Sequence, residues 1–185
     1  MHQTPTISTA YARLLFDYLR ALGRNPASIL PAAQVAEIET NHSHAQTSRT
    51  AWLEMIASIT ARSDDPDLAL KIGEAFQVRH LGVAGYVLIS CATLGEAGQQ
   101  VVRYYRLMGD VGSSQVHRCG EWAEDIFQWS EAGSPPPVLE QLWAAATVTL
   151  GRWLTGRNDL AWEAHFRFPR PSDISAYERI FHGTL

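Results

Sequence analysis

The chain has 185 residues, 46% of them hydrophobic, which suits one domain with a sizeable buried core. Its formal net charge of −4 argues against direct nucleic-acid binding, because phosphate contacts need a clustered basic face and the 15 Lys and Arg residues are scattered. We find no basic and apolar leader and no apolar run of about 18 residues, so neither secretion nor membrane spanning is indicated. We therefore expect a cytoplasmic protein.

Helical periodicity dominates the first 110 residues, which predicts an all-helical region. Apolar positions from Tyr11 to Leu22 mark an amphipathic helix that Gly23 can end. Asn25 and Pro26 then have the form of a cap and first residue of a short second helix.

The periodicity fades after Pro31, where we expect a short helix and then a mobile loop over residues 40–47. It returns around Trp52. A further helix is predicted to begin with Asp65 as its cap and Pro66 as its first residue. The run GVAGYVLISC that follows is apolar on nearly all sides, which favours a buried helix. Its glycines, Gly82 and Gly85, suit close helix packing better than a phosphate loop.

Residues 90–110, SCATLGEAGQQVVRYYRLMGD, predict an amphipathic helix with a marked start. Thr93 and Glu96 have the spacing of a capping box, in which each side chain satisfies a backbone N–H at the helix start. The apolar face predicted for this helix consists of Leu94, Ala97, Val101, Tyr104 and Met108.

The pattern changes from Ser113 onward. The segments SSQVHRCGEW and EDIFQWSE predict a β-hairpin, and prolines 135–137 open a long helix that Gly156 can close. Apolar and polar residues alternate strictly over residues 162–168, which predicts a third strand. We therefore expect an α+β fold with a mostly helical N-terminal two-thirds. A small antiparallel sheet, hairpin plus third strand, would follow and pack against the long helix.

No motif in the sequence indicates catalysis. We find no nucleophile elbow, zinc-protease or phosphate-loop signature, so the chain is not expected to be an enzyme or to hold a cofactor. Cys91 and Cys119 are expected to be free thiols. His42 and His44 lie in a polar loop without further ligands at metal-binding spacing, which favours solvated side chains. A haem or metal sensor remains an alternative, with candidate ligands His80, His117 and His165.

The aromatic residues of the C-terminal half are the main candidates for a binding site. Most should be core, because a sheet packed on a helix needs large side chains between the two. Ligand pockets are also mostly apolar, with a few placed polar groups. The residues predicted to contact a ligand are Tyr86, Arg103, Tyr104, Trp122, Trp129, Trp143 and His165.

Three segments together resemble a known family: DPDLALKIGEAF, GVAGYVLISCATLGEAGQQVVRYYRLMGD and FPRPSDISAYERIFHG. The family is the N-terminal effector-sensing domain, named "arabinose-binding", of one branch of the AraC/XylS transcriptional regulators. The resemblance covers most of residues 11–185. The positions that carry it are Gly82, Gly85, Tyr86, Ser90, Thr93, Leu94, Glu96, Ala97, Arg103, Tyr104, Pro171, Tyr177 and Phe181.

The resemblance implies an α-rich sensor that binds a small-molecule effector, often dimerises, and controls a C-terminal DNA-binding domain with two helix-turn-helix units. On this basis residues 1–185 would be a single effector-binding domain, truncated before that second domain. It would form a homodimer and reach DNA only through the absent part. The family's name does not specify arabinose, since members of the branch answer to amino acids and other metabolites. A pure dimerisation module is the other alternative.

Overall fold

The computed structural model describes residues 5–41, 45–130, 133–160 and 162–182. The α-helices are α1 (Thr9–Ala21), α2 (Ala32–Thr40), α3 (Arg49–Thr60), α4 (Leu68–Glu74), α5 (Val83–Ile89), α6 (Leu94–Met108), α7 (Pro137–Thr155) and α8 (Ser175–Phe181). The structure also contains the short 3₁₀ helices η1 (Pro26–Ser28) and η2 (Val78–Leu81) and the strands β1 (Thr6–Ser8), β2 (Gln46–Ser48), β3 (Gly112–Cys119) and β4 (Trp122–Trp129).

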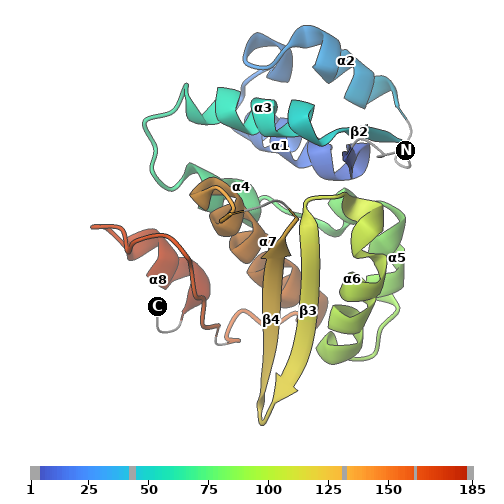
Figure 1. The fold of residues 1–185 in the computed structure, drawn as a ribbon, viewed down its shortest axis with the longest axis vertical. Coiled ribbons are helices and arrows are strands. Elements are labelled where there is room, and N and C mark those ends of the chain that lie inside the picture. The colour runs from blue at the N-terminus through green and yellow to red at the C-terminus, as the bar shows by residue number, and fades with distance from the viewer. Residues whose placement is uncertain (1–4, 42–44, 131–132, 161, 183–185) are drawn as a thin grey trace.

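The elements form an α+β arrangement, as predicted. The helices α1, α2 and α3 lie together at one end of the molecule, and the β3–β4 hairpin extends away from them (Figure 1). Helices α5 and α6 lie on one side of the hairpin, α8 lies on the other, and α7 runs behind it. Helix α6 packs directly on β3 and also contacts α7.

Several predicted helix boundaries are confirmed by their capping geometry. Helix α1 ends just before Gly23, which has a φ of +71°, and α7 ends at Gly156, which is left-handed with a φ of +65°. The Asn25 side chain accepts a hydrogen bond from the Ala27 N–H at 3.0 Å and caps η1. Thr93 Oγ1 accepts from the Glu96 N–H at 3.1 Å at the start of α6.

The predicted start of α4 is wrong by two residues. The helix begins at Leu68, and its N-cap residue, Asp67, makes no side-chain capping bond. Asp65 Oδ1 instead accepts from the Asp67 N–H at 3.0 Å and closes a local turn before the helix. Aspartate side chains favour such turns as readily as helix caps, and the sequence does not separate the two.

The all-helical prediction for the first 110 residues misses strands β1 and β2. They pair antiparallel, with Thr6 opposite Ser48 and Ser8 opposite Gln46. Each strand runs directly into a helix, and the last residue of the strand caps that helix. The Ser8 side chain accepts a hydrogen bond from the Tyr11 N–H at the start of α1, and the Ser48 side chain accepts one from the Ala51 N–H at the start of α3. Three residues are too few to show the two-residue periodicity of a strand. The predicted loop over residues 40–47 includes positions 42–44, with both of its histidines, which lie outside the described residues.

The hairpin is confirmed, but the predicted third strand is wrong. Strands β3 and β4 pair antiparallel from Gly112 opposite Trp129 to Cys119 opposite Trp122, as a two-stranded sheet. Residues 162–168 keep the alternating burial of a strand but join no ladder. The Arg167 N–H donates to the Glu140 carboxylate at 2.9 Å instead, so a side chain takes the place of a strand partner.

The prediction that residues 82–91 form a buried helix is also wrong. Helix α5 buries Ala84 and Leu88, whereas Val83, Tyr86 and Ile89 are 46%, 77% and 51% exposed. The predicted close packing at Gly85 is confirmed, since an added Cβ would lie 2.5 Å from the Val78 carbonyl oxygen. Only one face of the helix is therefore in the core.

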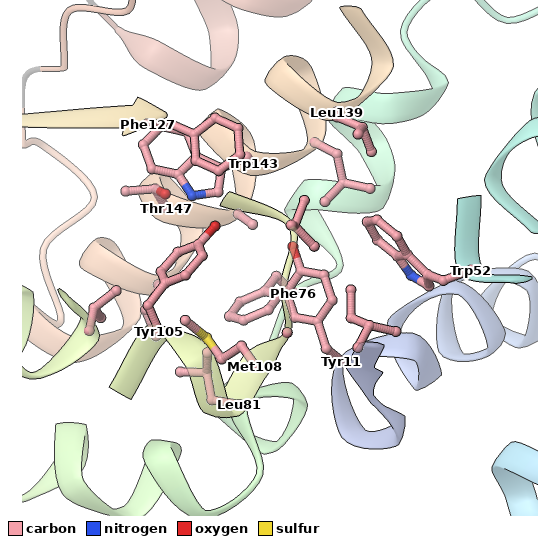
Figure 2. Close-up of a pocket in the computed structure, with 17 residues that line it drawn as sticks. Tyr11, Trp52, Phe76, Leu81, Tyr105, Met108, Phe127, Leu139, Trp143 and Thr147 are labelled. Carbon is pink, nitrogen blue, oxygen red and sulfur yellow. The ribbon is translucent and has the colours of Figure 1, made fainter. Parts of the chain in front are cut away.

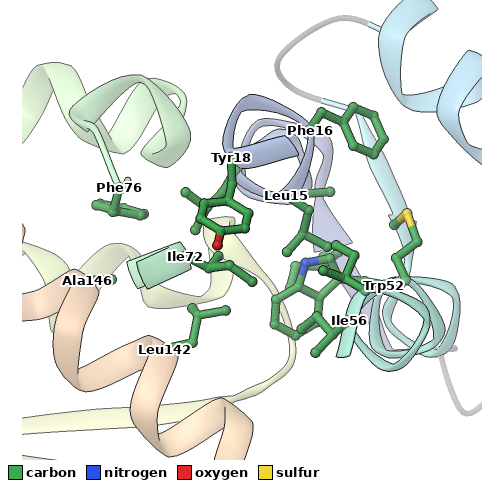
Figure 3. Close-up of a cluster of buried hydrophobic side chains, with 14 of the residues drawn as sticks. Leu15, Phe16, Tyr18, Trp52, Ile56, Ile72, Phe76, Leu142 and Ala146 are labelled. Atoms are coloured by element: carbon green, nitrogen blue, oxygen red, sulfur yellow. The ribbon is translucent and has the colours of Figure 1, made fainter. Parts of the chain in front are cut away.

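Helix α7 joins two buried clusters. The larger cluster lies between α1, α3, α4 and α7 and includes Leu15, Trp52 and Ile72 (Figure 3). The smaller cluster packs α8 and residues 162–168 against α4 and α7. The cysteines at 91 and 119 are free thiols.

Candidate ligand-binding site

An apolar cavity lies where α1, α3 and α7 meet the C-terminal end of α6. Its volume is about 70 Å³, and side chains from α1, α3, η2, α6, β4 and α7 line it (Figure 2). The larger side chains in its wall are Tyr11, Trp52, Phe76, Leu81, Tyr105, Met108, Phe127, Leu139 and Trp143. Elements far apart in the sequence thus contribute to one wall.

Helical spacing determines which residues of α6 face the core or the cavity. Ala97, Val101, Tyr105 and Met108 follow one another at intervals of four, four and three residues, and all four face the core or the cavity. The sequence prediction chose Tyr104 for this face. Tyr104 is half-buried, whereas Tyr105 is 9% exposed and points into the cavity.

The turn after α6 forms one end of the cavity. Gly109 has a φ of +151° and lies against β1, where an added Cβ would be 2.9 Å from the Ile7 Cα. The Arg49 guanidinium donates to the Asp110 carbonyl oxygen at 2.6 Å and to the Ser130 hydroxyl at 2.7 Å. These contacts tie α3, the α6–β3 turn and the end of β4 together beside the cavity.

The polar groups in the cavity wall are hydroxyls and the indole nitrogens of Trp52 and Trp143, of which Trp52 Nε1 is buried without a hydrogen-bond partner in the described structure. Figure 2 shows the hydroxyl end of Tyr105 pointing toward Trp143 and Thr147. Burial raises the pKa of Tyr105, with smaller contributions from Tyr11 and Asp125, and burial also raises the pKa of Tyr11. Both phenols therefore remain neutral at physiological pH. No residue in the described wall carries a formal charge.

A second concavity is a groove between β4, α7 and residues 162–168, with a volume of about 520 Å³. Glu140 in its wall is 7% exposed and accepts from Arg167, whose guanidinium also donates to the Phe127 carbonyl oxygen at 2.8 Å. Asp125 accepts from the Ser114 hydroxyl, and burial raises the pKa of Asp125 against that hydrogen bond. This groove is larger and more polar than the cavity.

The structure does not bring the seven predicted ligand contacts together. Of these, Trp143 lines both the cavity and the groove, and His165 lines the groove alone. Tyr86 lies in a separate surface groove beside Trp153. The remaining four, Arg103, Tyr104, Trp122 and Trp129, line neither the cavity nor the groove.

Three of these four take part in cation–π contacts that have no part in the cavity. The Arg103 guanidinium lies 5.5 Å from the ring centre of Tyr104, and Arg49 lies 5.9 Å from that of Trp129. Trp122, at the tip of the hairpin, is 54% exposed. The predicted contacts thus mostly lie on the surface of α6 and of the hairpin.

The histidines of the haem or metal alternative lie on three different segments: η2, β3 and residues 162–168. His80 is 1% exposed, and both of its ring nitrogens are engaged. Nδ1 accepts from the Gln77 N–H at 2.9 Å, and Nε2 lies 3.0 Å from Asp17 Oδ2. In the part of the chain that the structure describes, no three His, Cys, Asp or Glu side chains gather as a metal ion requires.

The residues that sequence reasoning missed as site residues are Tyr11, Trp52, Phe76 and Tyr105. The sequence marks the first three as buried, because they occupy apolar positions in or just after a helix. It does not show whether such a residue packs in the core or borders the cavity. Which buried aromatics border an empty space depends on how distant helices pack, and periodicity within one helix does not report it.

Comparison with known proteins finds a matching family and a relative. The family model described as "Arabinose-binding domain of AraC transcription regulator, N-term" matches residues 23–185. An ornithine utilization regulator of Pseudomonas aeruginosa is 29% identical over 103 residues, which cover 56% of this chain and 30% of that relative. The aligned part of the chain therefore covers less than a third of that relative's length.

Within the described residues, no helix combines the length and hydropathy needed to cross a membrane. The matched family is a class of transcription regulator and not an enzyme class. Because its model matches most of the sequence, the chain belongs to the arabinose-binding N-terminal domain family of AraC transcription regulators.

Proposed function

We propose that this chain is the effector-binding part of a transcription regulator and that its small-molecule effector occupies the apolar cavity. The observation that carries the proposal is the cavity wall itself, in which aromatic side chains from α1, α3, β4 and α7 surround a space with few polar groups. Such a concave, mostly apolar site is the usual form of a small-molecule pocket.

The position of the cavity gives an effector a way to act on the rest of the protein. Tyr11 and Trp143 lie far apart in the sequence yet share the wall. An occupant would therefore favour one arrangement of α1, α6 and α7 over others. A ligand shifts such an equilibrium by the difference between its affinities for the two states.

DNA contact belongs to a different part of the regulator in this proposal. The formal net charge of the chain is −4, and its aligned part covers less than a third of its relative. We place DNA binding in a further domain and expect the regulator to work as a homodimer. Sedimentation velocity tests the second point, since a monomer at all accessible concentrations would contradict self-association.

A second candidate site is the groove. Its wall carries the carboxylates of Glu124, Asp125 and Glu163 beside the rings of Trp143 and Trp162, which suits a cationic ligand. The relative's name refers to ornithine utilization, and ornithine carries two amino groups. A cationic amino acid would therefore be expected in the groove and not in the cavity.

A thermal-shift screen of the wild type and three variants tests these sites: Val101→Phe with its matched control Val102→Phe for the cavity, and Glu163→Gln for the groove. The ligand classes are amino acids, polyamines, sugars, fatty acids and aromatic acids, since a ligand of the folded state raises its melting temperature. Val101→Phe fills the cavity, and Val102→Phe adds the same ring to the exposed side of α6, where Val102 is 38% exposed.

The outcomes separate the sites. If a ligand raises the melting temperature of the wild type and the other variants but not of Val101→Phe, the cavity is supported as its site. If a ligand raises the melting temperature of Val101→Phe but not of Glu163→Gln, the groove is supported as its site. The absence of any shift, from folded protein, would contradict effector binding by this chain.

A further inference from the structure

We propose that the effector of the cavity is an uncharged, predominantly apolar molecule about the size of one six-membered ring, with a single hydroxyl or carbonyl oxygen. This inference rests on the proposed function, because it assigns a chemical class to the same site. It follows from the charge, the volume and the polar groups of the wall.

The charge of the wall excludes ionic ligands. The described side chains that line the cavity include no Asp, Glu, Lys, Arg or His, and its two tyrosines are held neutral by burial. A carboxylate or ammonium group moved from water into this space would meet no opposite charge, and such a transfer is strongly unfavourable. Free amino acids carry at least two such groups and are poor occupants.

The volume limits the size of the ligand. At about 70 Å³ the cavity is smaller than the roughly 150 Å³ apolar cavities that bind benzene, so even one ring requires some side-chain movement. Met108 in the wall is suited to this movement, because an unbranched thioether with three rotatable bonds adapts its shape at low cost. Long fatty acids and sugars would need a much larger rearrangement.

The polar groups of the wall place one oxygen atom of the ligand. Tyr105 is 9% exposed, and its hydroxyl makes no hydrogen bond within the described residues. In Figure 2 this hydroxyl points toward Thr147, whose own hydroxyl is likewise not hydrogen-bonded in the described structure. Among the described residues, the buried side-chain atoms without a hydrogen-bond partner include Trp52 Nε1 in the same wall but not these two hydroxyls, which therefore keep some exposed surface and can bond to an occupant. A ligand oxygen between Tyr105 and Thr147 would satisfy both hydroxyls.

A set of single-ring probes tests the class by calorimetry on the 185-residue chain. Phenol and toluene are neutral and of similar size, whereas benzoate and benzylamine are ionised at pH 7. We expect phenol to bind saturably, toluene more weakly, and the two ions at least a hundredfold more weakly than phenol. At a hundredfold excess over Kd, phenol should raise the melting temperature by about 5 to 10 °C.

Two tyrosine variants test the hydrogen bond. Tyr105→Phe should lower the affinity for phenol by about two- to tenfold, toward that of toluene, and leave toluene binding unchanged. Tyr104→Phe removes a hydroxyl from the neighbouring, half-buried position and should change neither affinity.

The results distinguish failure of the class from failure of the site. An ion or amino acid that binds more tightly than phenol, and is lost in Val101→Phe, would overturn the class while keeping the cavity as the site. Failure of all neutral probes to bind folded protein would also overturn the class. A ligand whose affinity is unchanged in Val101→Phe, whatever its charge, would overturn the cavity site itself.

Discussion

His80 is a buried histidine whose hydrogen bonds favour its neutral form. Nδ1 accepts from the Gln77 N–H at 2.9 Å, so the ring proton is on Nε2, which lies 3.0 Å from Asp17 Oδ2. A second proton on Nδ1 would break the bond from Gln77. Burial lowers the pKa of His80 below its ordinary 6.5, and Arg79 lowers it further, against the opposing effect of Asp17.

This pKa shift predicts a stability loss on mild acidification. Because the native pKa lies below 6.5, the unfolded chain takes up the proton more readily than the native chain as the pH falls from 7 toward the native pKa. The urea midpoint should fall over that range. His80→Asn keeps an acceptor for the Gln77 N–H but does not titrate, so the urea midpoint of this variant should change less with pH. Loss of the contact with Asp17 should cost about 1 to 3 kcal/mol at pH 7.

His165→Asn is the control for this prediction. The His165 side chain is 83% exposed, so its replacement should leave the pH profile of the wild type unchanged. Parallel profiles for wild type and His80→Asn would show that His80 does not cause the acid sensitivity.

At the scale of the element, α4 and α7 cross at a position that only glycine fits. A Cβ added to Gly73 would lie 2.6 Å from the Leu142 carbonyl oxygen and 2.9 Å from the Ala146 nitrogen. Both contacts are to the backbone of α7, which cannot move away as a flexible side chain could. The close approach of the two helices therefore depends on this residue.

Gly73→Ala should destabilise the protein by about 1 to 3 kcal/mol, because the added methyl group forces α4 and α7 apart. Gly95→Ala is the matched control, since Gly95 also lies in a helix and the nearest atom to its added Cβ is 3.9 Å away. That change should be neutral or slightly stabilising. Urea unfolding measures both, and equal stabilities of the two variants would contradict close packing at Gly73.

Local signals in the sequence were sufficient to predict many of the elements. Caps and glycines located the ends of α1 and α7 and the start of α6, because a capping bond forms between residues near in sequence. Residues 162–168 show the limit of such signals. Alternation reports an extended backbone with one buried face, but whether a strand or the Glu140 side chain pairs with it depends on the tertiary fold.

The candidate site was less predictable than the fold. Trp143 was predicted as a ligand contact and lines the cavity, whereas the choice between Tyr104 and Tyr105 on α6 required the true helix orientation. Two adjacent residues of the same type differ by about 100° around a helix, and the apolar pattern of α6 was compatible with either.

At the scale of the whole molecule, the two buried clusters meet on the same helices. On α7, Ala145 belongs to the smaller cluster and Ala146 to the larger. On α4, Leu70 belongs to the smaller cluster and Ile72 to the larger. Neither cluster can lose its packing without disturbing a helix that supports the other, so the described chain should unfold as one cooperative unit.

Leu70→Ala tests this cooperativity. Leu70 is fully buried, and its truncation should cost about 2 to 5 kcal/mol through lost contacts and a residual cavity. The urea midpoints from far-UV circular dichroism and from tryptophan fluorescence should fall together, because Trp52 lies in the larger cluster and Trp162 packs against the smaller. Leu107→Ala, at a position that is 51% exposed, should change stability by less than about 0.5 kcal/mol. If the two midpoints separate in Leu70→Ala, the cluster around α8 unfolds independently, and α7 does not couple the C-terminal segment to the cavity.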